Sequence, residues 1–569
     1  MSGPVDFDME DKVPDRQHAV QLVGPDRLSV TAEKPVTPPG PHQILCRVEA
    51  AGLCFSDLKL VKQFADHPRK SAITSGLDEE TLAQIPSYVP GQGPTVCGHE
   101  AAVRVAAVGD AVEGVHLGQR YVVQTDYRWL RTEKSNAAFG YNFEGALQEY
   151  VLLDRRVITS PQRELMLLPA SDAMSASAVA LVEPWACVED AYAEKQRQTI
   201  LPGGRMLVVV EPGVPECTIE NLFPAGGRPG ELTPVGRIAV PKGLGIPVKR
   251  TTHIDDLPDF GFDDIIYLGA KPETVEALFP KAAPYGLLTI ALCGGRLGRP
   301  TAVPVGRVHY AGIRIVGTTG FDPSTSMQAI PPCAEIRRSD RVNIVGAGGP
   351  MGVMHVVRSL CGGVAGVAVS ATDIDPKRLS SLRHIAAPLA ERNSLAFHAL
   401  DPSEGTAEGP FDYIVLLVPA PDLVSRAVES AGPRAIINIF AGIPVDVKAD
   451  IDLDAYIEKR LYFVGTSGST LDDMRSVLAK IESGTLDTDL SVAAVSGLAG
   501  AVEGIRSIER RELEGKVIVY PSCKELGLVT LDRLADRLPD VARWLERGRW
   551  NRRAENALRE ACAAAEGRP

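Results

Sequence analysis

Apolar residues in the second half of the chain occur in short runs and at helical spacing, in an order that predicts a parallel α/β sheet. Residues 341–345 form a β-branched run that leads into a glycine-rich turn, and apolar residues then recur at helical spacing through 353–357. A second apolar run, residues 367–372, ends at an acidic residue. Strand, turn, helix and strand in this order are typical of a βαβ unit.

The same order of signals occurs twice. Residues 262–269 (Phe-Asp-Asp-Ile-Ile-Tyr-Leu-Gly) match 411–418 (Phe-Asp-Tyr-Ile-Val-Leu-Leu-Val), and residues 314–320 match 462–468, at offsets of 149 and 148 residues. In each copy, the two matched segments are separated by a helix-like stretch, a turn and a short apolar strand. The chain is therefore predicted to be an α/β protein with two tandem Rossmann-like, doubly wound units.

Only the second unit, residues 332–470, has a candidate phosphate-binding loop. A glycine-rich turn lets backbone N–H groups approach a pyrophosphate, and the following helix N-terminus attracts negative charge. The turn departs by one residue from strict Gly-x-Gly-x-x-Gly spacing. In the first unit, residues 202–331, the strand at 206–211 runs into Pro-Gly-Val-Pro, so we expect this copy to be degenerate and structural. The predicted cofactor-binding residues of the loop are Gly346, Gly348, Gly349, Pro350, Met351 and Gly352.

Asp373 follows the second strand of this unit, 21 residues beyond Gly352. A carboxylate at this place in a Rossmann fold binds the ribose hydroxyls and repels the extra phosphate of NADP, which favours NAD over NADP. Alternatively, Asp373 and Asp375 form the N-cap region of the helix that begins at Pro376.

The part of the chain after the repeat combines helices with one predicted strand. Helical apolar spacing begins at Thr470, and residues 516–520 are predicted to form an edge strand. Residues 522–569 are predicted to be a helical extension, with amphipathic stretches at 531–538 and 541–545. Its arginines and tryptophans suggest an RNA or anion surface, but interleaved acidic residues favour a solvated helix anchored by tryptophan.

Length and composition restrict the class of protein. A chain of 569 residues, 45% of them hydrophobic, indicates several domains with real cores. A net charge of −12 and a pI near 5.5 argue against nucleic acid as the main partner. We find neither a signal sequence nor a stretch near the ~18 apolar residues that span a membrane. The ten cysteines show no disulfide framework, so we expect a cytoplasmic protein.

Residues suited to zinc are spaced through the first two hundred positions. Cys54, His99, Glu100 and Glu183 offer thiolate, imidazole and carboxylate, and about three such ligands with one exchangeable position mark a catalytic zinc site. No two cysteines form a Cys-x-x-Cys pair, so we expect one catalytic zinc and no structural zinc. Taken singly, each residue has an ordinary reading as a packing or polar residue. Whether Glu100 or Glu183 is the resting ligand stays open.

Four segments in the same order resemble the catalytic domain of the zinc-dependent medium-chain alcohol and polyol dehydrogenases. They are Val-Glu-Ala-Ala-Gly-Leu-Cys-Phe-Ser-Asp at 48–57, Cys-Gly-His-Glu at 97–100, the turn at 108–110 with Gly-Gln-Arg-Tyr-Val-Val at 118–123, and Gly-Ala-Leu-Gln-Glu-Tyr at 145–150.

The resemblance implies a β-rich, GroES-like catalytic domain over residues 1–201, completed by 471–521. It further implies that Ser56 relays the alcohol proton and that Asp57 orients the ligand His99, as a ligand imidazole requires. Residues 121–150 contain no cysteine, which is similar to the sugar and polyol branch of the family. Segments at 59–69 and 181–187 resemble sorbose-phosphate reductases in particular.

The predicted function is therefore hydride transfer between NAD and a secondary alcohol or ketone of a polyol, sugar or sugar phosphate. We expect a homo-oligomer with a small-molecule substrate and with neither nucleic acid nor membrane as a partner. Two other functions stay open: a zinc-independent reductase of the same fold, and a non-catalytic dinucleotide-binding scaffold. A basic loop could hold a substrate phosphate, although an exposed charged loop is the simpler interpretation. Its residues are Lys59, Lys62, His67, Arg69 and Lys70.

Overall fold

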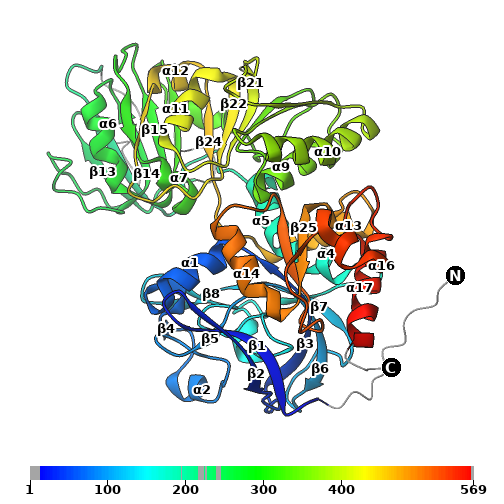
Figure 1. Ribbon diagram of the computed structural model, residues 1–569. Helices are drawn as coiled ribbons and strands as arrows, with labels where there is room; N and C mark the ends of the chain where they lie inside the picture. Colours follow the sequence, from blue (N-terminus) through cyan, green and yellow to red (C-terminus); the bar gives the residue numbers. More distant parts are fainter. Residues whose placement is uncertain are drawn as a thin grey trace. The chain divides into compact units, whose positions relative to one another are not determined.

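The computed structural model describes residues 13–193, 195–215, 223, 227–238, 245–405 and 407–565. The chain divides into two compact units, which are described separately (Figure 1). Unit 1 combines residues 1–186 and 468–569, and unit 2 comprises residues 187–467. The predicted α/β fold class, with a β-rich part and two parallel sheets, is confirmed. The domain limits inferred from the sequence remain proposals, because unit 2 holds both Rossmann-like copies.

Unit 1 contains most of the antiparallel structure. Its strands are β1 (Arg16–Gly24), β2 (Arg27–Pro35), β3 (Gln43–Leu53), β4 (Ile73–Ser75), β5 (Thr95–Val96), β6 (Glu100–Val108), β7 (Arg120–Val123), β8 (Asp126–Thr132), β9 (Asn136–Ala138), β10 (Tyr150–Asp154), β11 (Leu167–Pro169), β25 (Val492–Ser496), β26 (Lys516–Val519) and β27 (Val529–Thr530). Its helices are α1 (Phe55–Gln63), α2 (Glu79–Ala83), α3 (Arg155–Ile158), α4 (Ala176–Ala180), α13 (Leu471–Glu482), α14 (Leu498–Glu509), α15 (Leu534–Arg537), α16 (Pro539–Ala542) and α17 (Arg552–Ala565), and α5 (Val182–Ala193) crosses into unit 2.

The main sheet of unit 1 joins the two ends of the chain. Its strand order is β11-β7-β6-β3-β26-β25-β27, with β10 also paired to β3. The predicted edge strand at 516–520 is therefore wrong, because β26 lies between β3 and β25. A lysine at the start of a strand is typical of an exposed edge. Here Lys516 is buried and its charge is compensated by an ion pair with Glu100.

Unit 2 contains two parallel sheets. Its strands are β12 (Arg205–Val210), β13 (Glu231–Val235), β14 (Phe262–Leu268), β15 (Ala282–Ala291), β16 (Thr301–Val303), β17 (Arg314–Thr318), β18 (Arg341–Val345), β19 (Ala368–Thr372), β20 (Ala396–Leu400), β21 (Phe411–Leu416), β22 (Ala431–Ile439), β23 (Ala449–Ile451) and β24 (Tyr462–Val464). Its helices are α6 (Pro272–Leu278), α7 (Val305–Tyr310), α8 (Ser324–Gln328), α9 (Pro350–Cys361), α10 (Pro376–Arg392), α11 (Pro421–Ser430) and α12 (Leu453–Glu458).

The two sheets of unit 2 are copies of one topology. Copy 1, residues 205–328, has strand order β13-β12-β14-β15-β17, and copy 2, residues 341–464, has β20-β19-β18-β21-β22-β24. Phe262 pairs with Ala282, and Phe411 pairs with Ala431, and the register shifts directly after each of these pairs. The predicted internal repeat is thus reproduced down to the irregularities of its strands.

The copies differ between their first two strands. In copy 2 a glycine turn and helix α9 connect β18 to β19. In copy 1 the described residues between β12 and β13, which leave out 216–222 and 224–226, contain no helix. Copy 1 therefore lacks, in its described part, the turn and helix that a bound pyrophosphate requires.

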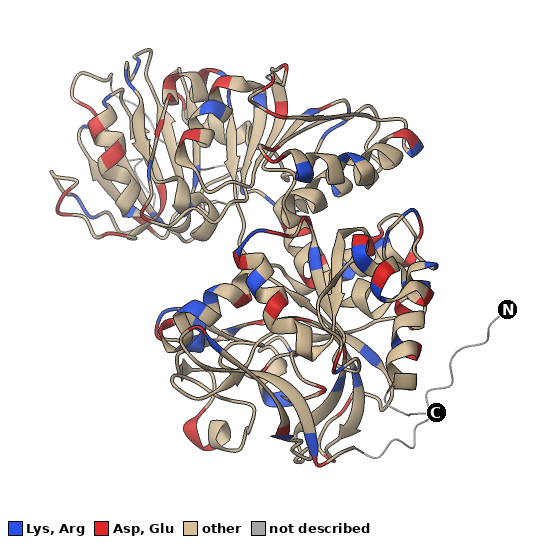
Figure 2. Ribbon diagram, viewed as in Figure 1, with Lys and Arg blue, Asp and Glu red and all other residues tan. Residues whose placement is uncertain are grey.

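The end of the chain is fixed to unit 1 by buried side chains. Trp550 is buried and donates from its indole N–H to Ser177 and Tyr520, whereas Trp544 is 40% exposed. Glu555 accepts hydrogen bonds from the backbone N–H groups at positions 176 and 177 and from the Tyr520 hydroxyl. The predicted tryptophan anchor is therefore present. Acidic and basic residues lie side by side on the helices of both units (Figure 2).

The amphipathic helices expected at 531–538 and 541–545 are present as short elements: a 3-10 helix at Leu531–Arg533, α15 and α16. They are separate because Leu538 leaves the helical conformation before Pro539, as residues that precede proline tend to do. One expectation for this segment is wrong. Cys523 and Cys562 form a disulfide, although no such framework was expected. They lie 39 residues apart, and their pairing follows from the folding of α17 against unit 1.

Asp489 makes the stability of unit 1 depend on pH. Burial, together with the negative charges of Asp487 and Glu555, raises the pKa of Asp489 from 3.8 to about 8. The folded protein thus binds a proton that the unfolded chain releases, so this stabilisation is complete below pH 3.8 and is lost as pH rises through about 8. Asp489→Asn should flatten the pH dependence of the free energy of unfolding by about 1 kcal/mol per pH unit between these limits.

Urea unfolding across this pH range measures the effect, with the exposed Asp536→Asn as the control. A pH dependence that is the same in Asp489→Asn and in the original chain would contradict the assignment.

Candidate active site

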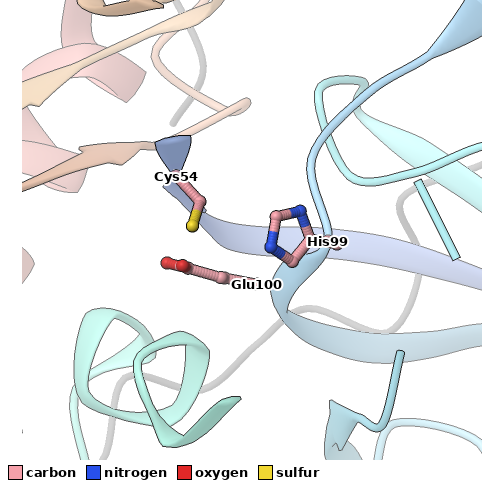
Figure 3. Close-up of side chains that lie close together, drawn as sticks. All are labelled: Cys54, His99 and Glu100. Carbon is pink, nitrogen blue, oxygen red and sulfur yellow. The ribbon is translucent and has the colours of Figure 1, made fainter. Parts of the chain in front are cut away.

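Three predicted zinc ligands converge in unit 1. Cys54 directly follows β3 and is the N-cap residue of α1, and His99 directly precedes β6. Strands β3 and β6 pair in a register that places Gly52 opposite Glu100. One ligand atom from each of Cys54, His99 and Glu100 lies within 4.8 Å of the others (Figure 3). The antiparallel pairing of two strands therefore assembles the cluster.

Asp57 holds the cluster in place. Its fully buried carboxylate accepts hydrogen bonds from the Cys54 backbone N–H at 2.9 Å, the Gly98 backbone N–H at 3.2 Å and His99 Nδ1 at 3.0 Å. Burial alone would raise the pKa of Asp57, but the charge of His99 and these hydrogen bonds hold it below its usual range. Because Nδ1 faces Asp57, Nε2 is left as the ligand atom of His99. Asp57 thus lies where the sequence predicted it.

Glu100 is buried with one oxygen paired and the other free for a ligand. Oε1 forms an ion pair with Lys516, and Oε2 has no hydrogen-bond partner among the described residues. Burial alone would lower the pKa of Lys516, but the charges of Cys54 and Glu100 raise it. The Glu100 side chain occupies the space where a Cβ on Gly52 would lie. A glycine at position 52 is therefore needed for Glu100 to reach the cluster.

These residues fit a zinc ion. Thiolate, imidazole and carboxylate are the donor types that zinc prefers, and a buried carboxylate oxygen without a partner is costly unless a ligand satisfies it. Only three groups converge among the residues that the structure describes, which leaves a fourth position for an exchangeable ligand. The arrangement suits catalysis better than structural support.

Glu183 and Ser56 lie around this cluster without joining it. Glu183 is half-buried in the first turn of α5 and is outside the group of three converging residues. Burial and the negative charge of Glu100 raise the pKa of Glu183 to about 7, against the opposing effect of His99. Ser56 is half-buried in the first turn of α1, two residues beyond Cys54. The geometry thus favours Glu100 over Glu183 as the carboxylate of the cluster.

The basic residues after Cys54 do not form one loop, because Lys59 and Lys62 lie within α1. Lys70 is fully buried and donates to the carbonyl oxygens of Val89 and Gly93. Lys62 forms ion pairs with Asp26 and Glu509. These two lysines are structural, and the idea of a five-residue phosphate site is not supported by their contacts.

His67 and Arg69 lie nearest to the cluster. Both rings, His67 and His99, pack against Tyr141, at centroid distances of 5.1 and 5.7 Å. Burial, with the positive charges of Arg69 and Lys59, lowers the pKa of His67 to about 4 and keeps it neutral. Arg69 forms a 2.7 Å ion pair with Asp126. His67 and Tyr141 thus line the surroundings of the cluster with neutral polar groups.

The sequence did not reveal the roles of Lys516 and Tyr141. Lys516 lies 416 residues beyond Glu100, and nothing local distinguishes it from a lysine on a sheet edge. The only available signal was a charged residue entering an apolar strand. Burial raises the pKa of Tyr141 to about 12, so its hydroxyl is protonated at neutral pH.

The glycine-rich turn of copy 2 leads into α9 as predicted. Gly346 has a φ of 81°, which favours glycine, and a Cβ on Gly352 would lie 2.6 Å from the Ala347 backbone. Gly349 is the N-cap of α9, and its α-carbon faces open space. Pro350 and Met351, the first residues of α9, are half-buried. The turn therefore packs tightly at Gly352, against the Ala347 backbone, and leaves space at Gly349, at the N-terminus of α9, where an anion would bind.

Asp373 braces this turn. Its buried carboxylate accepts from the Gly348 N–H at 2.9 Å and from the Asp375 N–H at 3.0 Å. Asp375 is the N-cap of α10 and accepts from the N–H groups of Lys377 and Arg378. The helix-cap interpretation thus holds for Asp375, whereas Asp373 links the second strand to the glycine loop. Its ribose contact remains a proposal.

Comparison with known proteins agrees with this geometry. Residues 40–162 match the alcohol dehydrogenase GroES-like domain, and Cys54, Ser56, Asp57, His99 and Glu100 all lie within the match. L-sorbose 1-phosphate reductase of Klebsiella pneumoniae is 30% identical over 236 residues, which cover 39% of this chain and 55% of that protein. Over these stretches the chain is similar to the medium-chain alcohol and polyol dehydrogenases.

A second curated relative and a solved structure are also similar to this chain. Mannitol-1-phosphate 5-dehydrogenase of Aliivibrio fischeri is 26% identical over 248 residues, covering 40% of this chain and 57% of that protein. The chain thus spans little more than half the length of these curated relatives. The crystal structure of 2R,3R-butanediol dehydrogenase from Bacillus subtilis shares the fold with a TM-score of 0.51 at 14% identity, covering 89% of this chain and 99% of that one.

One structural finding concerns membranes. Across the described residues, the helices are all too short or too polar to cross a bilayer.

Removing the charge of Asp57 should weaken metal binding. Asp57→Asn keeps the shape of the side chain but no longer fixes His99 by a carboxylate, so zinc affinity should fall about 10- to 100-fold. Competition with a chromophoric chelator measures the affinity. Asp110→Asn, at an exposed turn, is the control and should bind zinc as the original chain does. Equal affinities for all three proteins would refute a role for Asp57 at the metal.

Removing Lys516 should make stability depend on metal. Lys516→Met leaves the buried Glu100 without its counter-charge, and breaking a buried ion pair costs about 3 kcal/mol of unfolding free energy. A bound divalent cation would replace the lost charge, so the deficit should shrink when zinc is added.

Urea unfolding with chelator and with zinc tests this expectation. The control is Lys524→Met, which breaks the ion pair of Lys524 with Glu149, a pair more exposed than that of Lys516 with Glu100. A deficit of the same size under both conditions would contradict the proposed coupling of Lys516, Glu100 and metal.

Proposed function

We propose that this protein is a zinc-dependent oxidoreductase that transfers hydride between NAD(H) and a secondary alcohol or ketone of a polyol, sugar or sugar phosphate. The observation that supports it most directly is the convergence of Cys54, His99 and Glu100, braced by Asp57. A packing role does not explain why an unpartnered Glu100 oxygen, an oriented His99 imidazole and a half-buried Cys54 thiol occur together.

Two groups would supply chemistry that side chains lack. Zinc held by Cys54, His99 and Glu100 would lower the pKa of a substrate hydroxyl and polarise a substrate carbonyl. NAD held at the glycine turn, with Asp373 at its ribose, would accept the hydride. Oxidation of the alcohol then releases one proton and one hydride and yields a ketone.

The side chains of the protein handle the proton. Ser56, two residues from Cys54, accepts the hydroxyl proton and passes it outward. Asp57 keeps His99 in one tautomer, so that its ring does not compete for that proton. Glu183, with a pKa near 7, is able to take up or release a proton at neutral pH.

The names of two relatives support the proposed substrate class. Two of them are named for sugar or polyol phosphates, L-sorbose 1-phosphate and mannitol 1-phosphate. In the present chain His67 is neutral and Arg69 is already paired with Asp126, so these side chains also suit an uncharged polyol. We therefore include both phosphorylated and free substrates in the proposal.

A substrate screen with metal analysis tests the function. Polyols, ketoses and their phosphates are offered with NAD(H) or NADP(H), and turnover is followed by NADH absorbance. We expect turnover with at least one class, a preference for NAD, and one zinc per chain. Cys54→Ala should lose both zinc and activity. Cys97→Ala, at a buried cysteine outside the cluster, should keep them.

Ser56→Ala separates catalysis from binding. It should lower kcat while the zinc content stays at one per chain. Turnover that survives in Cys54→Ala would indicate a zinc-independent reductase. Bound NADH and zinc without turnover of any substrate would indicate a scaffold.

A further inference from the structure

The two copies in unit 2 contact each other through equivalent residues. Strands β16 of copy 1 and β23 of copy 2 pair antiparallel, with Ala302 opposite Asp450. These two positions are 148 residues apart, the offset of the sequence repeat. On either side, Thr301 pairs with Ile451, the equivalent of Val303, and Val303 pairs with Ala449, the equivalent of Thr301.

Close approaches between the copies are reciprocal in the same way. A Cβ on Gly317 would meet Ile457, and a Cβ on Gly465 would meet His309. Gly465 is the equivalent of Gly317, and Ile457 is the equivalent of His309, again at an offset of 148. The contact from copy 1 to copy 2 is thus repeated from copy 2 to copy 1.

A second pair of contacts between the copies is reciprocal in the same sense. A Cβ on Gly306 would meet the carbonyl of Pro444, and the Asp454 carboxylate lies 3.9 Å from Arg296. Asp454 is equivalent to Gly306, and Pro444 to Arg296. The Asp454 carboxylate also accepts from the backbone N–H groups of residues 297 and 298, at 2.9 Å each.

Both copies contribute to one continuous core. Strands β17 and β24, each at one end of its sheet, lie next to each other. The Tyr456 hydroxyl donates to the Ile315 carbonyl at 2.9 Å, and Arg314 donates to the Gly465 carbonyl at 3.1 Å. The buried residues of this core include the equivalent pairs Val308 and Tyr456, Ile313 and Leu461, and Ile315 and Phe463.

This reciprocity is the pattern of a two-fold interface between identical subunits. In such an interface, residue i of one subunit contacts j of the other, and j of the first contacts i of the second. Here both halves belong to one chain. We propose that copy 1 is a tethered partner subunit, which takes at β23 and β24 the place that copy 2 of a second chain would otherwise occupy.

The differences between the copies agree with this role. Copy 1 departs from copy 2 around β12 and β13, where the nucleotide loop would lie. It retains β15, β16, α7 and β17, which form the contact with copy 2. The part of copy 1 that a partner needs is thus intact. The inference rests on the duplicated fold and holds whether or not the proposed dehydrogenase activity is correct.

Cysteine cross-linking at the paired strands tests the proposal. In the double variant Ala302→Cys/Asp450→Cys, the two thiols lie on directly opposed residues, which are close enough for a short bismaleimide. We expect most chains to be cross-linked between positions 302 and 450 and to migrate as monomers in denaturing gels. Peptide mass spectrometry, with the unsubstituted chain as background for its native cysteines, identifies the link.

The single variant Asp450→Cys is the decisive control. If copy 2 faced copy 2 of another chain, position 450 would lie opposite position 450, and covalent dimers would form. We expect no such link. Covalent dimers of Asp450→Cys, or of the double variant, would overturn the proposal.

A failure of the double variant to cross-link would also overturn it, provided that a known antiparallel pair reacts. Gln21→Cys/Ser29→Cys, on the opposed residues of β1 and β2, supplies that positive control. Activity is not a readout in this experiment, so its result is independent of the proposed function.

Discussion

The Asp57 carboxylate is the group on which the site depends. It binds the backbone N–H that begins α1, the backbone N–H before His99, and the imidazole of His99 itself. One buried side chain thereby fixes the end of β3, the start of β6 and the orientation of a ligand. Burying a carboxylate is costly, and here three donors offset that cost. The position of the metal cluster is therefore decided by a residue that is not itself a ligand.

Charge balance extends this arrangement. The Glu100 carboxylate is buried beside the cluster, and Lys516 is the buried cation that opposes its charge. A lysine can be replaced in this role by a divalent cation, because both satisfy the same carboxylate. The proposed zinc and Lys516 would therefore share the neutralisation of Glu100. The fold of the site does not have to be created by the metal, in contrast to small zinc domains.

Local sequence signals predicted the elements that depend on neighbours in the chain. The run at 341–345, the glycine turn and α9 follow each other within twenty residues, and turn chemistry with apolar spacing sufficed to place them. Cys54, Asp57 and His99 were recognised because their short motifs carry their own chemistry.

Predictions failed where distant strands decide. Whether β26 is an edge or a central strand depends on its pairing with β3, which lies more than 450 residues earlier. The disulfide of Cys523 with Cys562 and the burial of Trp550 depend on the same tertiary contacts. The distinction between Glu100 and Glu183 as cluster members also required three-dimensional distances, because both have the right chemistry.

The insertion of unit 2 into unit 1 has a consequence for synthesis of the chain. Strand β3 precedes unit 2 in the chain, whereas its neighbour β26 and the Glu555 that binds Ser177 follow unit 2. All of unit 2, residues 187–467, is translated between β3 and β26. The pairing of its two copies uses residues from that interval alone, whereas the main sheet of unit 1 lacks β26 until later residues are made. Glu100 therefore lacks its counter-charge Lys516 until unit 2 has been made, although Cys54, His99 and Glu100 all precede that unit in the chain.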